Sequence, residues 1–85
     1  MRVIIPTPLR SYTGRREVTA SGPTLGALLA DLDRQYPGIR FRMIDEQDRM
    51  RPHVRFFVDG SPVLDLAHPL GSAAEVIIVP ALSGG

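Results

Sequence analysis

The chain has 85 residues and a formal net charge of +1, which predicts one small domain and argues against nucleic acid or a membrane surface as its main partner. It has no cysteine, so disulfides, thiolate metal ligands and cysteine nucleophiles are excluded, and no apolar run approaches the roughly 20 residues that span a bilayer. A domain of this size has little room for an internal pocket as well as a core, so we do not expect an enzyme by itself. Residues 1–6 are too short for a secretory apolar segment, so a cytoplasmic protein is expected.

Two short strands are predicted before the first long helix. Met1–Ile5 alternates with the period of two of a strand, which places Ile4 on the face opposite its apolar neighbours. Pro6 ends this strand because proline cannot donate to a sheet ladder. Ser11–Gly14 has the composition of a turn, and Arg16–Ala20 is predicted to be the return strand of a hairpin.

An amphipathic helix is the strongest local prediction. Thr24 can cap the free N–H groups of its first turn, and Pro37-Gly38 ends it. Apolar side chains recur at the spacing of one helical face, and they are Leu25, Leu28, Leu29, Leu32 and Tyr36. This stripe is predicted to cover one face of a sheet.

The second half of the chain is predicted to contain three more strands. Ile39–Pro52 is less regular, and its apolar residues predict a short helical turn followed by a polar loop. His53–Asp59 alternates as a strand, and Asp59-Gly60 is a tight-turn signal before a short strand at Ser61–Leu64. Glu75–Val79 is predicted to be the last strand.

The order of these elements predicts an α+β domain of the β-grasp (ubiquitin-like) type, with a mixed sheet of four to five strands packed on one helix. The first and last strands are expected to be parallel neighbours, because the helix supplies the crossover between them, and the strand at 53–59 is expected beside the last one. Residues 1–79 are assigned to this domain and residues 80–85 to a flexible Gly-Gly tail. The predicted core consists of Val3, Ile5, Leu25, Leu28, Leu29, Leu32, Val54, Phe56, Val58, Leu70, Val76 and Ile78.

The segment after the last strand is slim and ends in Gly84-Gly85. Measured from Pro80, it can reach about 20 Å when extended, and glycine without a Cβ fits a narrow channel. Such a segment can carry the Gly85 carboxylate into the active site of another protein. There the carboxylate can attack ATP to give an acyl-adenylate, which a sulfur donor converts to a thiocarboxylate. Glycines are also common at frayed chain ends, so this interpretation depends on their position directly after the last strand of this fold.

Segments spread over the whole chain are similar to those of one known family. Glu75–Gly85 has the pattern of its final strand and tail, His68-Pro69-Leu70 resembles a preceding loop, and Ile5-Pro6-Thr7 and Thr24-Leu25-Gly26 are further matches. By these segments the chain resembles the ubiquitin-like sulfur-carrier family, which includes ThiS and the small subunit of molybdopterin synthase (MoaD), and it is most similar to the CysO branch. At Gly71–Ala74 many relatives carry a Gly-Asp turn that this chain lacks, which leaves the form of this turn open.

The resemblance implies how the tail is used. In the family, a ubiquitin-activating-type adenylyltransferase and sulfurtransferase consumes ATP to adenylate the terminal glycine and convert it to a thiocarboxylate. That role falls on Gly85, with Gly84 providing access. The carrier then donates sulfur to a cysteine-synthase-type or thiazole-synthase-type enzyme, and in the first case a metallopeptidase releases cysteine. The resemblance implies no cofactor bound to the carrier itself.

The sheet face away from the helix is predicted to be the docking surface for these partners. Period-two counting places five residues there, and they are Ile4, Arg55, Phe57, Ile77 and Val79. A contiguous apolar patch beside the tail is typical of an interface, and Phe57 is expected to be the main anchor because large aromatic residues dominate interface energetics. Leu82 in the tail is assigned to the same surface. The alternative is that Ile39–Pro52 or a second copy of the chain covers this face.

Other candidate sites are interpreted as ordinary surface. His53 and His68 are the only histidines and lack metal-ligand spacing, so no metal site is predicted. Arginines are concentrated in residues 40–55, but three carboxylates in the same segment dilute their charge, and a solvated face is favoured over an anion site. A ubiquitin-like protein modifier or interaction module joined through Gly85 is the alternative function, because it shares the activation chemistry.

Overall fold

The computed structural model describes residues 1–80, and Ala81–Gly85 lie outside the described residues. The described strands are β1 (Arg2–Ile4), β2 (Glu17–Thr19), β3 (Val54–Val58), β4 (Ser61–Val63) and β5 (Glu75–Pro80). The α-helices are α1 (Arg10–Thr13) and α2 (Leu25–Gln35), and two 3-10 helices are present, η1 (Thr7–Leu9) and η2 (Arg40–Arg42). The predicted order of the strands and the long helix is confirmed.

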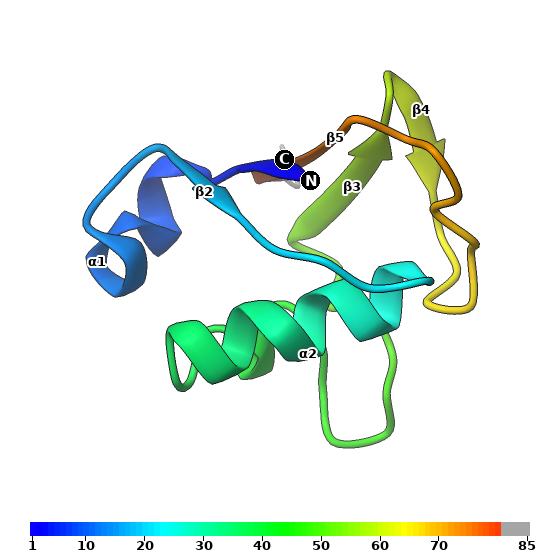
Figure 1. Ribbon diagram of the computed structural model, residues 1–85. Helices are drawn as coiled ribbons and strands as arrows, with labels where there is room; N and C mark the ends of the chain where they lie inside the picture. The colour runs from blue at the N-terminus through cyan, green and yellow to red at the C-terminus, as the bar shows by residue number, and fades with distance from the viewer. Residues whose placement is uncertain (81–85) are drawn as a thin grey trace.

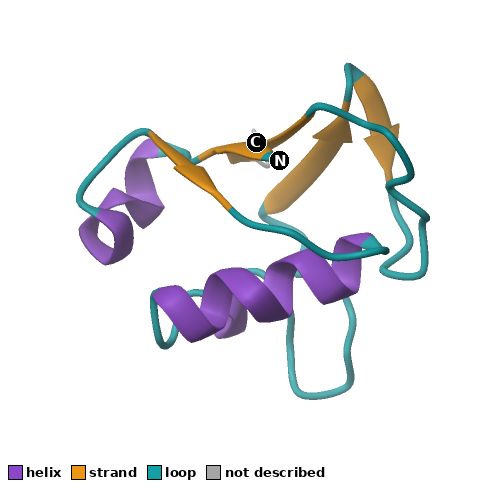
Figure 2. Ribbon diagram, viewed as in Figure 1, coloured by secondary structure: helices purple, strands orange, loops and turns teal. Residues whose placement is uncertain are grey.

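One mixed sheet organises the fold. Its strand order is β2-β1-β5-β3-β4, with β1 and β5 parallel and every other pair of neighbours antiparallel. Figures 1 and 2 show α2 lying across one face of the sheet, below it in this view. In the chain, α2 follows the β1–β2 hairpin and precedes the β3–β4 hairpin. This is the predicted α+β arrangement with its parallel central pair.

The last strand is longer than the sequence predicts. β5 continues through Pro80, which lies opposite Val54 of β3, whereas the predicted strand ends at Val79. Proline is tolerated at the end of a strand because the ladder there does not require its missing N–H. Strand structure therefore continues to the last described residue.

Helix α2 begins and ends close to the predicted residues. The Thr24 hydroxyl accepts a hydrogen bond from the Ala27 N–H at 3.2 Å, which is the predicted N-terminal cap. Tyr36 is the C-terminal cap, and Gly38 at a φ of +98° lets the chain reverse after the helix. Local signals therefore define this helix at both ends.

The loop before β5 is anchored on the start of α2. The Leu25 N–H donates to the His68 carbonyl at 3.0 Å, and the Leu70 N–H donates to the Pro23 carbonyl at 2.9 Å. The Leu70 side chain is buried in the core. These contacts fix the position of the loop that leads into β5.

The core is a single cluster between the sheet and α2, and every residue predicted to belong to it is buried. The cluster also contains residues outside the predicted set, which are Leu9, Val18, Ala20, Ile39, Met43, Ile44 and Val63. Three of these flank the 3-10 helix η2: Ile39 precedes it, and Met43 and Ile44 follow it, all fully buried. The predicted helical turn in this segment is therefore confirmed, and it enlarges the core.

The connection between β1 and β2 differs from its prediction. The sequence predicts a turn at Ser11–Gly14, whereas the chain forms η1 and then α1. Gly14 ends α1 at a φ of +71°, and its N–H donates to the Arg10 carbonyl at 2.7 Å. Pro8 suits the first turn of η1 because its φ is already fixed, and the buried Leu9 packs the segment against the core. This long-range packing is not visible in the turn-like composition.

Candidate functional site

The candidate site is the end of β5 and the sheet face beside it. Gly84 and Gly85, to which the chemistry is assigned, and the docking residue Leu82 lie outside the described residues. The structure describes the strand that leads to them, which ends at the exposed Pro80. We refer to Val79 and Pro80 as the tail root.

Apolar side chains are aligned across neighbouring strands on the sheet face away from α2. Ile4 of β1 lies opposite Ile77 of β5, and Ile77 lies opposite Phe57 of β3. Phe57 in turn lies opposite Pro62 of β4. Ile4, Phe57 and Ile77 are half-buried, and Pro62 is exposed. The structure therefore brings the predicted docking residues Ile4, Phe57 and Ile77 together in one row across the sheet, and Pro62, which was not predicted, extends it.

This apolar row extends to the tail root. Val79 is half-buried, points to the same face as Ile77, and lies opposite Arg55 of β3. The Arg55 guanidinium donates to the carbonyls of Pro52 and Val54, at 3.0 Å each. We call Ile4, Phe57, Ile77 and Val79 the outer patch; it is a contiguous surface that reaches the start of the tail.

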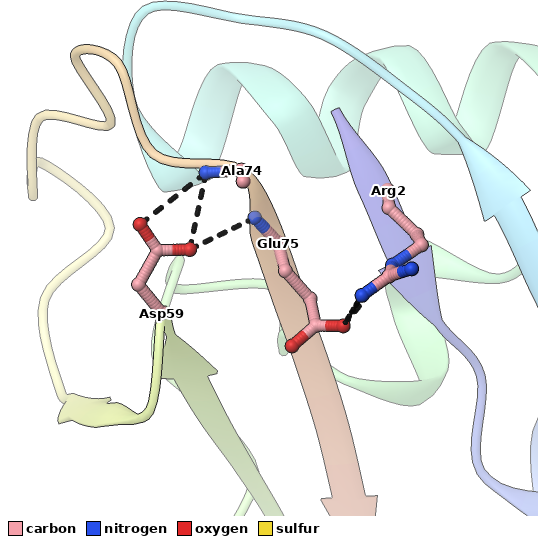
Figure 3. Close-up of polar contacts among 4 residues, drawn as sticks. All are labelled: Arg2, Asp59, Ala74 and Glu75. Carbon is pink, nitrogen blue, oxygen red and sulfur yellow. Dashed lines mark hydrogen bonds and ion pairs between the residues drawn. The ribbon is translucent and has the colours of Figure 1, made fainter.

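The start of β5 is held by Asp59, which lies in the turn between β3 and β4 (Figure 3). The Asp59 carboxylate accepts hydrogen bonds from the N–H groups of Ala74 and Glu75, at 3.0 Å each. Its own N–H donates to the Glu75 carbonyl at 3.0 Å. Asp59 and Gly60 have φ values of +47° and +86°, as expected for a two-residue type I′ hairpin turn. One residue therefore makes the predicted tight turn and also fixes the strand that leads to the tail.

This second role of Asp59 was missed by sequence reasoning. The pair Asp59-Gly60 predicts the turn, but the N–H partners of the carboxylate lie 15 and 16 residues further along the chain, beyond any local pattern. The turn at Gly71–Ala74, whose form the sequence left open, has Gly71 at a φ of +52° and the Ala73 N–H donating to the Leu70 carbonyl at 2.8 Å. The carboxylate that orders the first residues of β5 thus comes from a different turn.

An ion pair joins β1 to β5 at the same end of the sheet (Figure 3). The Arg2 side chain donates through Nε to Glu75 Oε2 at 3.1 Å, and the backbone N–H of Arg2 donates to the Ala74 carbonyl at 3.2 Å. The hydrogen bond and the charge of Glu75 raise the pKa of Arg2 above its ordinary value. Together with Asp59, this contact holds the start of β5 from both neighbouring strands.

A small hollow lies beside the tail root. Its volume is about 210 Å³, and it is lined by Pro6, Pro8, Leu9, Arg42, His53, Val54 and Pro80.

Within residues 1–80, no group of three or more histidine and carboxylate side chains is placed to hold a metal ion. None of the helices in the described part of the chain is long and apolar enough to cross a membrane.

Comparison with known proteins gives the family. The model of the ThiS family matches residues 3–85 of this chain. The sulfur carrier protein CysO of Mycobacterium tuberculosis is 39% identical over 89 residues, which cover 98% of this chain and 96% of that protein.

Two solved structures are similar over nearly the whole chain. The crystal structure of Mycobacterium tuberculosis CysO, an antigen, has a TM-score of 0.88 at 37% identity and covers 95% of this chain and 98% of its own. A chain of the Amycolatopsis orientalis BexX/CysO complex also has a TM-score of 0.88, at 28% identity, and covers 99% of this chain and 98% of its own. The chain therefore belongs to the ThiS family, and the resemblance found in the sequence is confirmed.

Proposed function

We propose that this member of the ThiS family is a sulfur carrier, a protein co-substrate whose cargo is bound at the carboxylate of Gly85. The observation that carries the proposal is the family match, which begins at residue 3 and extends through Gly84 and Gly85. The similarity to the CysO protein of Mycobacterium tuberculosis, which is named a sulfur carrier protein, supports the same role.

The proposed chemistry consists of two substitutions. An oxygen of the Gly85 carboxylate attacks the α-phosphorus of ATP, the bond from that phosphorus to the bridging oxygen breaks, and pyrophosphate leaves. The product is an acyl-adenylate. Sulfur at the oxidation level of sulfide (HS⁻) then attacks the carbonyl carbon, the bond from that carbon to the adenylate oxygen breaks, AMP leaves, and loss of the sulfur-bound proton gives a thiocarboxylate. A ubiquitin-activating-type adenylyltransferase and sulfurtransferase binds ATP and supplies the sulfur. Gly84 has no side chain, so Gly85 can reach its active site through a narrow channel.

The domain is proposed to present the tail and to dock on the enzymes that use it. β5 is fixed at its start by Asp59 and Arg2 and leads directly to Pro80. The outer patch lies on β5 and its two neighbours, so an enzyme bound there is in contact with the strand from which the tail leaves. Docking on the outer patch therefore directs Gly84-Gly85 into the active site, with Leu82 and Arg55 contributing to the same contact.

The sulfur acceptor is proposed to be a cysteine-synthase-type enzyme, because the chain is similar to CysO. In that pathway a metallopeptidase releases the product from the carrier. A thiazole-synthase-type enzyme is the other candidate acceptor. The BexX/CysO complex, in which a similar chain is found, supports a function that involves a protein partner.

Deleting Gly85 tests the assignment of the carboxylate. With the adenylyltransferase of the same genome, the parent chain is expected to support ATP–pyrophosphate exchange, and the truncated chain is expected to support none. The melting temperature should not change, because the core consists of residues 3–78. Leu64→Ala, at a side chain that is 80% exposed, is the control and should retain exchange. Exchange by the truncated chain would contradict the proposal.

Intact mass of the protein from its native host separates the carrier from a protein modifier. A carrier is expected to show a form in which sulfur replaces one oxygen at the terminal glycine. A modifier is expected to appear as heavy adducts on other proteins, and finding only such adducts would count against sulfur transfer.

A further inference from the structure

Two of the arginines in residues 40–55 are paired within their own loop. Arg40 Nη2 lies 3.0 Å from Asp48 Oδ1, and Arg49 Nε lies 3.5 Å from Asp45 Oδ2. The sequence favours a solvated face for this segment because carboxylates dilute its positive charge. In the structure, these ion pairs neutralise only the charges of Arg40 and Arg49.

Arg42 and Arg51 are held by aromatic neighbours instead. Arg42 Nε donates to the Tyr12 hydroxyl at 2.9 Å, with its guanidinium 6.0 Å from the ring centroid. Arg51 Nε donates to the Phe41 carbonyl at 2.6 Å, with its guanidinium 4.4 Å from the Phe41 ring centroid. No carboxylate among residues 1–80 forms an ion pair with either guanidinium. Both groups are therefore oriented by neutral partners, and neither forms an ion pair within residues 1–80, although the charge of Arg51 also helps to lower the pKa of Asp45.

Arg42 and Arg51 both line one surface hollow. This hollow, which we call the arginine hollow, has a volume of about 260 Å³ and is lined by Phe41, Arg42, Glu46, Arg51 and His53. Phe41 is 55% exposed, and Glu46 is the single carboxylate in the lining. Arg42 and His53 also line the hollow that contains Pro80, so the arginine hollow adjoins the tail root.

We propose that the arginine hollow binds aspartate or glutamate side chains of the enzyme that activates the tail. The inference rests on the proposed function, because an enzyme that takes Gly85 into its active site must face the surface around Pro80. Guanidinium groups present parallel N–H donors that match carboxylate oxygens two at a time. Because ring contacts already orient Arg42 and Arg51, less side-chain entropy is lost when they bind.

The arginine hollow and the outer patch have different tasks in this arrangement. The outer patch supplies apolar contact area. Charged groups at the rim of an interface mainly raise the association rate and fix the orientation of the two proteins. The arginine hollow therefore fixes the orientation in which the tail enters the active site of the enzyme. The exposed ring of Phe41 adds an apolar contact beside the charges.

Binding of the full chain to the adenylyltransferase of the same genome, measured by calorimetry at low and high salt, tests the proposal. Arg42→Ala and Arg51→Ala are each expected to weaken binding about two- to fivefold at low salt, as for an exposed ion pair, and to reduce its salt dependence. Glu46→Gln is expected to strengthen binding, because it removes a negative charge that faces the same carboxylates. Arg34→Ala on α2 changes the net charge equally at a side chain that is 77% exposed, and should have no effect.

Structural damage and failure of the proposed function give different results. Arg51→Lys keeps the charge but not the stacked guanidinium, and should weaken binding less than Arg51→Ala at an unchanged melting temperature. If the arginine variants and Glu46→Gln bind like the parent while the parent supports ATP–pyrophosphate exchange, the inference is wrong and the proposed function stands. If the parent supports no exchange with the enzyme it binds, the proposed function fails by itself.

Two further measurements exclude other occupants. A chain without residues 81–85 should still bind more weakly when Arg51 is replaced by Ala. If that difference disappears, the arginines act on this chain's own terminal carboxylate and the inference is overturned. Inorganic phosphate at matched ionic strength should not compete more strongly than chloride, and stronger competition would identify a phosphate site instead.

Discussion

The two ends of β5 differ in how their charged groups are bonded. At the start, the Asp59 carboxylate accepts hydrogen bonds from two backbone N–H groups, and Glu75 pairs with Arg2 (Figure 3). At the end, beside Pro80, the arginine hollow contains two guanidinium groups without a carboxylate partner in residues 1–80. The first arrangement stabilises the chain itself, whereas the second leaves charge available to another molecule.

This difference suits a strand that presents a tail. Because β5 is fixed at its start, it can hold the tail in one direction. The guanidinium groups of Arg42 and Arg51, which have no ion-pair partner in residues 1–80, can meanwhile bind a partner around the tail root. The outer patch connects the two regions, because Ile77 lies midway along β5 and Val79 lies at its end.

The largest expected effect is in the core that both ends share. Leu29 of α2 is fully buried, so Leu29→Ala is expected to lower the free energy of unfolding by about 2–5 kcal/mol. That is a large share of the stability of a small domain, and hydrogen exchange at both ends of β5 should increase together. Chemical denaturation measures the loss, with Leu64→Ala as the exposed control. A loss below about 0.5 kcal/mol would mean that α2 packs on another face.

The next largest effect is expected at the start of β5. Asp59→Gly keeps the positive φ of the turn and removes the carboxylate. It should lower the free energy of unfolding by about 1.5–3 kcal/mol, the range for hydrogen bonds to a charged group. Asp59→Asn keeps one acceptor oxygen and should cost less. Glu46→Gln makes the same charge change as Asp59→Asn at an exposed side chain outside the contacts that hold the start of β5, and is the control. The amide exchange rates of Ala74 and Glu75 should increase more than that of Val54. Equal increases at both ends would contradict the separation of the two regions.

Local patterns were sufficient to predict most of the fold. The stripe of leucines on α2, the Thr24 cap and the Asp59-Gly60 turn are local signals, and the structure contains all three. The pairing of β1 with β5 followed from chain connectivity alone. The turn predicted at Ser11–Gly14 was wrong because the helical conformation there depends on packing of Leu9 against the core.

The tail root was less predictable from the sequence. Alternation correctly placed the outer patch on one face, since the period of a strand fixes which side chains share it. The arginine hollow was not predicted, because the sequence shows how many carboxylates lie near the arginines but not which arginines they pair with. Asp45 and Asp48 pair with Arg49 and Arg40, and only the folded loop reveals this choice.

A third prediction concerns binding rather than stability. Phe57→Ala removes the only aromatic ring of the outer patch and should weaken binding of the activating enzyme by more than about 1 kcal/mol. Because Phe57 is half-buried on the face opposite α2, the melting temperature should change little. Leu64→Ala serves again as the control, at an exposed apolar residue outside the patch. A Phe57 variant that is activated and used like the parent would show that docking occurs elsewhere.

The smallest expected effect is a response of the arginine-bearing loop to acid. The Asp45 carboxylate accepts hydrogen bonds from the N–H groups of Arg49 and Gln47, at 3.0 and 2.9 Å, and pairs with the Arg49 side chain. These contacts, the backbone bond to Arg49 above all, hold the pKa of Asp45 below its ordinary value. The folded state therefore favours the ionised carboxylate.

Because the pKa is lower in the folded chain than in the unfolded one, the contribution of Asp45 to stability is complete above the unfolded value, near pH 4, and is lost as the pH falls through the folded value. Acidification below about pH 4 should therefore speed amide exchange at Gln47 and Arg49, and Asp45→Asn should remove that acid dependence. The titration of the Asp45 carboxyl carbon by NMR measures the pKa directly, with Glu17→Gln as the control for net charge. A pKa of Asp45 at or above that of an unfolded aspartate would show that the loop is not ordered by this carboxylate. The ion pair between Arg49 and Asp45 would then no longer support the distinction between paired and unpaired arginines. The contrast between the two ends of β5 depends on that distinction, and only the pair of Arg40 with Asp48 would still support it.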